Sequence, residues 1–228
     1  MATLVERDVP LAPLTTLKVG GKAAHFVVVR DLDSLREALA YATEQMLPVI
    51  TLGGGSNVLI ADRGLSGLVI KNEITGIDVK VVGETVHVRA GAGEELDAVI
   101  KQLTEAGYWG LENLSGIPGT VGGAVVQNAN AYGVTIGDIV SAVETVCLSD
   151  GTQQNFTQRE CAFEYRNSRF KAPNGHGQYL ITHVNLELST TPVTALSYQS
   201  ASQSMAKCLV QRGITTYSGG YTYGGARD

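Results

Sequence analysis

The spacing of apolar residues along the chain predicts amphipathic helices separated by strands. Apolar residues recur at helical intervals over 31–45 and over 94–106, so each segment should form a helix with one buried face. Asp31 or Asp33 can cap the first helix, and Gly107 is placed to end the second.

Short runs of β-branched and apolar residues predict the strands. The runs cover 25–29, 48–51, 67–70, 85–89, 139–148 and 179–188, the last alternating almost perfectly. Because a strand, a helix and a strand follow one another over 25–51, they predict a βαβ unit with parallel strands. Asp150-Gly151 predicts a hairpin turn. A weaker helical pattern covers 196–210, and the Gly/Tyr-rich segment 217–228 has no period and should be a loose tail.

Two glycine-rich segments interrupt this pattern. They are Leu52-Gly-Gly-Gly-Ser-Asn-Val-Leu-Ile60 and Gly116-Ile-Pro-Gly-Thr-Val-Gly-Gly-Ala-Val-Val-Gln-Asn-Ala-Asn-Ala-Tyr-Gly133, each set among apolar, strand-like residues. A structural turn needs one or two glycines, whereas a run of them lets the backbone approach a ligand and turn its N–H groups toward an anion, usually a pyrophosphate. We therefore expect the fold to bring both segments to one large ligand.

Two common nucleotide-binding motifs are absent from the sequence. A dinucleotide fingerprint needs G-x-G-x-x-G between a strand and a helix, but Gly53-Gly-Gly-Ser-Asn57 leads into Val58-Leu-Ile-Ala61, which looks extended. There is also no G-x-x-x-x-G-K-[ST] loop. The first segment is therefore predicted to be a phosphate nest of backbone amides with no helix behind it, helped by the side chains of Ser56 and Asn57.

Composition narrows the class of protein. A net charge of −5 argues against a nucleic-acid or anionic-membrane partner, and no apolar run is long enough to insert into a membrane. Cys147, Cys161 and Cys208 lack metal-ligand spacing and are odd in number, so we expect buried free thiols in a cytoplasmic protein. The four histidines stand apart, so no metal site is expected, and Trp109 should be a core or interface aromatic.

The ordered motifs resemble a family of bacterial flavoenzymes. Both glycine segments and Tyr165-Arg-Asn-Ser-Arg-Phe170 occur in this order in the UDP-N-acetylenolpyruvoylglucosamine reductases, also called UDP-N-acetylmuramate dehydrogenases, and Leu14-Thr-Thr-Leu-Lys-Val-Gly-Gly21 resembles their opening turn. The similarity covers roughly residues 11–190. It implies an α+β, two-subdomain FAD-binding module of the vanillyl-alcohol-oxidase type. The expected division is 11–75 and 76–190, followed by a short helical remnant and tail at 191–228.

The resemblance also assigns a cofactor site and a reaction. The reaction is the reduction of UDP-N-acetylglucosamine enolpyruvate to UDP-N-acetylmuramate for peptidoglycan, with FAD bound and NADPH as reductant. The first loop would contact the pyrophosphate, and the second would line and support the flavin. The residues carried over are Gly53, Gly54, Gly55, Ser56, Asn57, Ile117, Pro118, Gly119, Thr120, Gly122, Gly123, Ala124, Gln127 and Asn128.

Tyr165 and Arg166 match the substrate-side pair of the family. The resemblance implies that Arg166 is catalytic, binding the enolpyruvyl carboxylate and stabilising developing charge, while Tyr165 orients the substrate. A forked, permanently charged guanidinium suits that task. Without the motif, Arg166 would be read as a solvated or salt-bridged residue, and Arg169 and Lys171 as surface charge.

The resemblance is incomplete in two places. The family continues into a third domain with a proton-donating serine in a Gly-Ser-Phe-Phe-Lys-Asn-Pro-like segment and a late glutamate, and neither segment appears in this sequence. Ser218 lacks the surrounding motif, so we do not assign it that role. We therefore expect weak or absent catalysis, and the alternative function is an inactive FAD-binding remnant or interaction module. Asn130 also replaces a glycine usual in the family, which raises the question of its backbone conformation.

Overall fold

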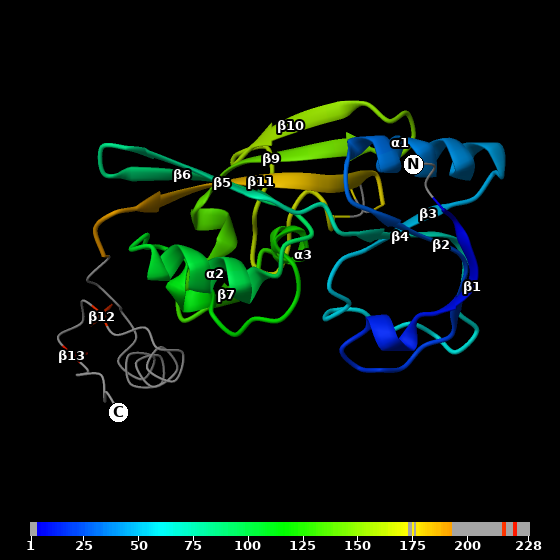
Figure 1. Ribbon diagram of the computed structural model, residues 1–228, viewed down its shortest axis with the longest axis horizontal. Helices are drawn as coiled ribbons and strands as arrows, with labels where there is room; N and C mark the ends of the chain where they lie inside the picture. The colour runs from blue at the N-terminus through cyan, green and yellow to red at the C-terminus, as the bar shows by residue number, and fades with distance from the viewer. Residues whose placement is uncertain (1–3, 173–174, 176, 193–215, 218–220, 223–228) are drawn as a thin grey trace.

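Two β-sheets lie beside each other in the computed structural model, which describes residues 4–172, 175, 177–192, 216–217 and 221–222 (Figure 1). The first sheet has the order β1-β2-β4-β3, with β1 at Glu6–Pro10, β2 at Lys22–Val29, β4 at Leu65–Asn72 and β3 at Val49–Leu52. Strands β2 and β3 both run parallel to β4, which lies between them. The expected βαβ unit is therefore confirmed in direction, but its two strands are not neighbours.

Helix α1 (Leu32–Glu44) begins where the sequence predicts. Asp31 is its N-cap: Oδ1 accepts from the N–H of Ser34 at 2.7 Å, and the Ser34 hydroxyl accepts from the N–H of Asp31 at 3.2 Å. The helix buries Leu35 and Leu39 against one face of the first sheet. The other face is covered by the loops around the short helix η1 (Ala12–Leu14), where Leu11 and Ile60 are buried.

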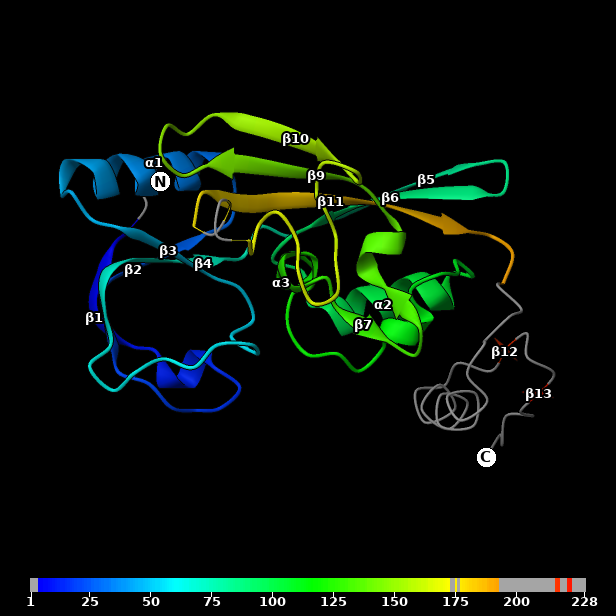
Figure 2. The same ribbon diagram turned by 180° about the vertical axis from the view of Figure 1, so that it is seen from behind.

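The second sheet is antiparallel and has the order β10-β9-β11-β6-β5. Its strands are β5 (Ile77–Val82), β6 (Thr85–Gly91), β9 (Val140–Cys147), β10 (Gln153–Thr157) and β11 (Tyr179–Ser189). Helices α2 (Leu96–Glu105) and α3 (Val121–Gln127) lie on one face of this sheet, as seen from behind in Figure 2. Short elements complete the set: η2 (Glu112–Leu114), β7 (Asn130–Ala131), β8 (Val134–Thr135), η3 (Ile136–Asp138), β12 (Thr216–Tyr217) and β13 (Tyr221–Thr222).

The two sheets are joined by a buried amide. Asn72, at the end of β4, donates through Nδ2 to the carbonyl of Ile181 in β11 at 2.8 Å and accepts from the N–H of Ile74 at 3.1 Å. Leu180 and Val146 of the second sheet pack into the same apolar cluster as α1. The sheets therefore share core contacts as well as a connecting segment.

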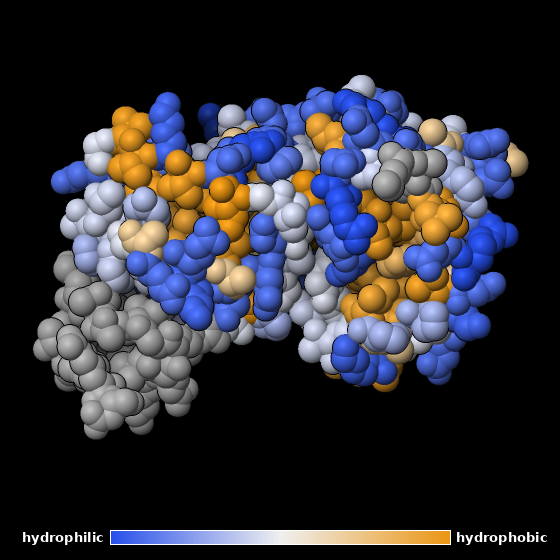
Figure 3. Space-filling model, in the orientation of Figure 1, coloured by the Kyte–Doolittle hydropathy of each residue, from blue (hydrophilic) through white to orange (hydrophobic). Residues whose placement is uncertain are grey.

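Exposed apolar residues remain on both parts of the molecule. Val79, Val81 and Val82 lie on the edge strand β5, and Leu17 and Leu59 lie on the loops that cover the first sheet. Figure 3 shows orange surface on both parts of the face in view. Among the described residues, no helix is both long and apolar enough to cross a bilayer.

Most of the predicted elements are confirmed. The strands at 25–29, 48–51, 67–70, 85–89, 139–148 and 179–188, both amphipathic helices and the hairpin turn at Asp150-Gly151 all appear, and Trp109 is buried. Strands β1 and β5 and helix α3 were not predicted. The helix expected over 196–210 lies outside the described residues, and so does most of the segment 217–228. The two short described strands near it, β12 and β13, pair with each other. The expected boundaries at 11–75 and 76–190 stay a prediction.

Candidate functional site

The two glycine segments are in direct contact, although they are far apart in sequence. The Ser56 hydroxyl donates to the carbonyl of Pro118 at 3.0 Å. A Cβ added to Gly54 would lie 2.7 Å from the Cα of Gly119, and one added to Gly119 would lie 2.6 Å from Ser56 Oγ. A side chain at Gly54 would therefore separate the segments, and one at Gly119 would displace the Ser56 hydroxyl that bonds to Pro118.

Several of the glycines are required by close packing within the protein. Gly55 has φ of +68°, and a Cβ there would meet the carbonyl oxygen of Leu14 at 2.0 Å. A Cβ on Gly122 would lie 2.8 Å from that of Ala92, and one on Gly53 would lie 2.8 Å from Thr120 Oγ1. By contrast, Gly123 is exposed, and a Cβ there would make only an ordinary contact at 3.4 Å with Thr120.

Backbone donors without an acceptor gather where the segments meet. Within the described part of the chain, the N–H groups of Gly54, Gly55, Ser56, Asn57 and Gly119 make no hydrogen bond to a protein acceptor. Backbone donors require a partner, and these groups, which have no acceptor among the described residues, are suited to bind an anion. Successive free amides of this kind form an anion-binding nest, and no helix follows the first segment, as expected.

The second segment departs from its expected strand-like surroundings. Thr120 caps helix α3, because its Oγ1 accepts from the N–H of Gly123 at 3.3 Å. The helix ends at Asn128, whose φ is +45°. Asn130 lies in β7, and the positive φ angles after it belong to Tyr132 and Gly133, which form the tight turn between β7 and β8. Asn130 itself therefore does not need the left-handed backbone conformation that a glycine would favour.

Gln127 and Asn128 connect the two segments to the Tyr165–Arg166 region. Gln127 Oε1 accepts from Asn57 Nδ2 at 3.1 Å. Asn128 donates to the carbonyl of Glu164 at 2.8 Å and accepts from the N–H of Gly137 at 3.0 Å. Both residues therefore tie neighbouring segments of the protein together, and their role toward a flavin stays a prediction.

Tyr165 and Arg166 form the tip of a tight turn. Glu164 and Asn167 exchange backbone hydrogen bonds of 3.0 and 3.1 Å across it. Arg166 has φ of +55°, a conformation that costs energy for a residue with a side chain. Both side chains are exposed, Tyr165 by 83%. The Ser168 hydroxyl donates to the carbonyl of Val126 at 2.8 Å, which ties the base of the turn to α3.

The remaining predicted residues differ in how far they are exposed. Ile117 and Gly119 are partly buried, Pro118 is exposed, and Ala124 is buried against the core of the second sheet. The expected cofactor residues therefore lie together in the fold, next to the turn that carries Arg166.

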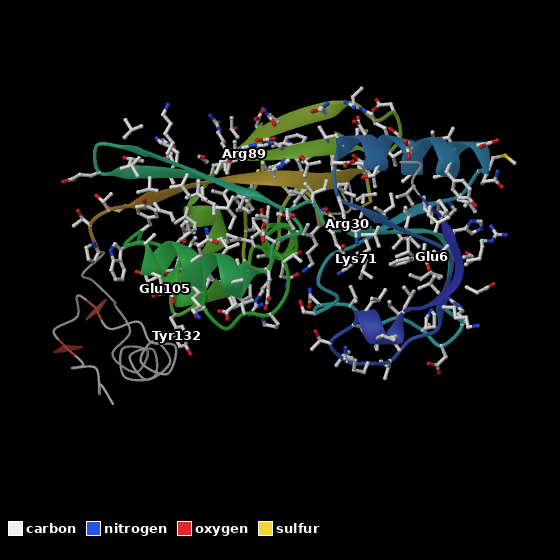
Figure 4. The ribbon with its side chains drawn as sticks, in the orientation of Figure 1. Glu6, Arg30, Lys71, Arg89, Glu105 and Tyr132 are labelled. Carbon is white, nitrogen blue, oxygen red and sulfur yellow. The ribbon has the colours of Figure 1, made fainter. Side chains whose placement is uncertain are left out.

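Two lysines belong to this region although sequence reasoning did not select them. Lys71 lies on β4 opposite Leu52, at the end of the strand nearest the second sheet, and Figure 4 shows it there. Its Nζ donates to the carbonyl of Gly53, and burial lowers its pKa. Lys171, read above as surface charge in the alternative interpretation, donates to Gln127 Oε1 at 2.7 Å and to the carbonyl of Arg166 at 2.9 Å. The sequence did offer a signal for Lys71, because a lysine there interrupts an apolar strand pattern.

Comparison with known proteins identifies the family. Residues 23–157 match the model of the FAD binding domain family. A UDP-N-acetylenolpyruvoylglucosamine reductase from Cutibacterium acnes is 41% identical over 183 residues, covering 80% of this chain and 48% of that protein. One from Pseudomonas putida is 38% identical over 211 residues, covering 92% of this chain and 60% of that protein. The chain thus spans about half to three fifths of the length of these relatives.

The solved structures agree with the sequence relatives. The crystal structure of the UDP-N-acetylenolpyruvylglucosamine reductase from Thermus caldophilus superposes with a TM-score of 0.70 at 31% identity, covering 92% of this chain and 70% of that one. The chain belongs to the UDP-N-acetylenolpyruvoylglucosamine reductase family. A VAO-type flavoprotein from Myceliophthora thermophila, at 19% identity and a TM-score of 0.54, shares the fold over 74% of this chain and 32% of that one. The expected α+β FAD-binding module of the vanillyl-alcohol-oxidase type is therefore confirmed.

Proposed function

We propose that this chain binds FAD and forms the flavin part of a reductase that converts UDP-N-acetylglucosamine enolpyruvate to UDP-N-acetylmuramate in the cytoplasm. The observation that carries the proposal is the nest of unpaired amides at the contact between the two glycine segments, beside the Arg166 turn. Membership of the FAD binding domain family supports the cofactor assignment.

The residues present fit a dinucleotide. The free amides of Gly54, Ser56 and Gly119 are suited to the oxygens of a pyrophosphate, which needs several donors at once. Lys71 adds a positive charge beside the first segment. The exposed backbone at Gly123 leaves room for a flat group against α3. When bound, FAD supplies hydride transfer, with NADPH proposed as its reductant.

Arg166 is proposed to hold the carboxylate of the substrate. Its guanidinium is exposed at the tip of a turn that is anchored to α3 through Asn128 and Ser168. A guanidinium binds a carboxylate through two parallel hydrogen bonds and stabilises negative charge that develops next to it. Tyr165, the other residue at the tip, is proposed to orient the UDP-sugar substrate.

A titration followed by rapid kinetics tests the proposal. Purified protein should take up FAD with a shifted flavin absorbance, and NADPH should then reduce the bound flavin in a stopped-flow instrument. UDP-N-acetylglucosamine enolpyruvate should reoxidise it only slowly, since weak or absent catalysis is expected from the sequence, and reoxidation at a rate normal for such enzymes would overturn that expectation. FAD uptake without reduction by NADPH would favour the inactive binding remnant, and reduction by a different donor would favour a flavin oxidase or dehydrogenase on another substrate. A protein that ignores FAD would contradict all of these functions.

A further inference from the structure

Lys171 occupies a junction between the cofactor segments and the substrate turn. Its ammonium donates to two acceptors: the side-chain oxygen of Gln127, at the end of α3, at 2.7 Å, and the main-chain carbonyl of Arg166 at 2.9 Å. The same oxygen of Gln127 accepts from Asn57 in the first glycine segment at 3.1 Å. One continuous set of hydrogen bonds therefore runs from Asn57 to Arg166.

The carbonyl that Lys171 holds belongs to a residue with a costly backbone conformation. Arg166 has φ of +55°, and a non-glycine residue keeps such an angle only when its surroundings enforce it. Hydrogen bonds from a charged donor are stronger than those between neutral groups. The side chain of Lys171 is partly buried and reaches back along the chain to its acceptor, so a change in its length or charge would release the tip of the turn.

The other anchors of the turn act at different points. Asn128 holds the carbonyl of Glu164, before the tip, and Ser168 bonds to α3 after it. Among the described residues, Lys171 is the side chain that bonds to the backbone of the tip itself. Its role is therefore separable from theirs by substitution.

We propose that Lys171 is a positioning residue: it fixes the Arg166 backbone to the cofactor segments through Gln127, so that the guanidinium is held in place for the carboxylate of the substrate. This proposal rests on the proposed function for the identity of the substrate. The claim that Lys171 holds the turn does not depend on the identity of the substrate and can be tested in the protein without FAD.

The test separates these two parts. Amide hydrogen exchange of Glu164 and Asn167, whose N–H groups close the turn, is measured in the protein without FAD for the unmodified chain, Lys171→Met and Lys171→Arg. We expect Lys171→Met to speed exchange at these two amides about ten- to a hundred-fold, the range for loss of a hydrogen bond to a charged group. Val184, in the core of β11, should be unaffected. Lys171→Arg, which keeps the charge and donors, should recover most of the protection.

A matched control and a coupled variant sharpen the result. Lys101→Met removes an exposed lysine on α2, paired with Glu105 at 3.8 Å, and should change nothing at the turn. Gln127→Ala should speed exchange at the turn by itself but add little in the Lys171→Met background, because both variants break the same connection. Unchanged exchange at the turn in Lys171→Met would overturn the proposal, as would a uniform increase that includes Val184.

The functional part uses binding to the FAD-loaded protein. Lys171→Met should keep its FAD affinity within about three-fold while binding UDP-N-acetylglucosamine enolpyruvate at least ten-fold more weakly, followed by flavin absorbance. Equal substrate affinity in Lys171→Met and the unmodified protein would overturn the positioning role. Failure of the unmodified protein to take up FAD would instead overturn the proposed function and the assigned substrate, and the exchange data would still decide whether Lys171 holds the turn.

Discussion

Gly54 and Gly119 meet backbone to backbone: a Cβ on Gly54 would lie 2.7 Å from the Cα of Gly119. Real Cβ atoms essentially never approach another atom so closely, and the neighbouring atom is main chain, which cannot rotate away. The contact joins two segments that are separated in sequence by the strands β4, β5 and β6 and the helix α2, and it places the free amides of both beside one another.

Gly54→Ala is therefore expected to push the two segments apart. We predict that FAD affinity falls at least ten-fold, measured by titration against flavin absorbance, because the amides would no longer converge on one anion. The thermal midpoint of the FAD-free protein should also fall, since the methyl group strains a contact that exists without ligand.

Gly123→Ala is the matched control within the same site. The added methyl group makes only an ordinary 3.4 Å contact, and alanine is the better helix former in α3. The thermal midpoint of the FAD-free protein should stay equal or rise, while FAD affinity falls if this glycine lies against the flavin. Equal FAD affinity in Gly54→Ala and the unmodified protein would show that the contact between the segments does not form the binding site.

Arg166→Ala should separate cofactor binding from substrate binding. Because the side chain is exposed and no described contact joins it to the glycine segments, FAD content should be unchanged. Loss of a charge-assisted contact should cost roughly 2–4 kcal/mol of transition-state stabilisation. Steady-state turnover and substrate titration measure this effect, with Arg36→Ala on the exposed face of α1 as control. Loss of FAD in Arg166→Ala would assign the residue a structural role.

Asn72→Leu should weaken the junction between the two sheets. The change leaves the carbonyl of Ile181 and the N–H of Ile74 without the partner that Asn72 provides in a buried position. We expect the free energy of unfolding in urea to fall by about 1–3 kcal/mol. Asn155→Leu, on the exposed side of β10, should change it by no more than about 0.5 kcal/mol. Similar values for both variants would contradict the importance of this junction.

The raised pKa of the Cys161 thiol predicts that the free energy of unfolding falls at alkaline pH. Burial raises its pKa from 9.0 to about 12 in the folded protein. Above pH 9 the unfolded chain therefore loses this proton while the folded protein keeps it, so stability falls as pH rises. The expected contribution is about 1.4 kcal/mol per pH unit between pH 9 and 12.

Urea unfolding at pH 8 and pH 11 measures this dependence. Cys161→Ala removes the group, so its stability should decline less over the same interval than that of the unmodified protein. Parallel declines in the two proteins would contradict the raised pKa. Cys147, which is only partly buried, should react with a thiol reagent at pH 8 while Cys161 does not.

The sequence alone determined the features that depend on neighbouring residues. Helical spacing over 31–45 and 94–106 specified both amphipathic helices, and Asp150-Gly151 specified a hairpin, because turns and periodicity are set within a few residues. The cap of the first helix was limited to Asp31 or Asp33, and the structure selects Asp31. The ordered motifs likewise identified the family and, through it, the fold.

The tertiary structure decided everything that depends on strand order and burial. Strand β5 was not predicted although Ile77-Asp-Val-Lys-Val-Val82 alternates apolar and polar residues, and the fold leaves nearly all of it exposed on an edge. Helix α3 was missed because Val121-Gly-Gly-Ala124 has little helix propensity and needs Thr120 and the core beside it. The contact between Gly54 and Gly119 and the bond from Lys171 to Gln127 join residues that no local pattern relates. The glycine contact depends on how the two parts of the chain pack together, and the bond from Lys171 to Gln127 depends on how the segment after β10 packs on α3.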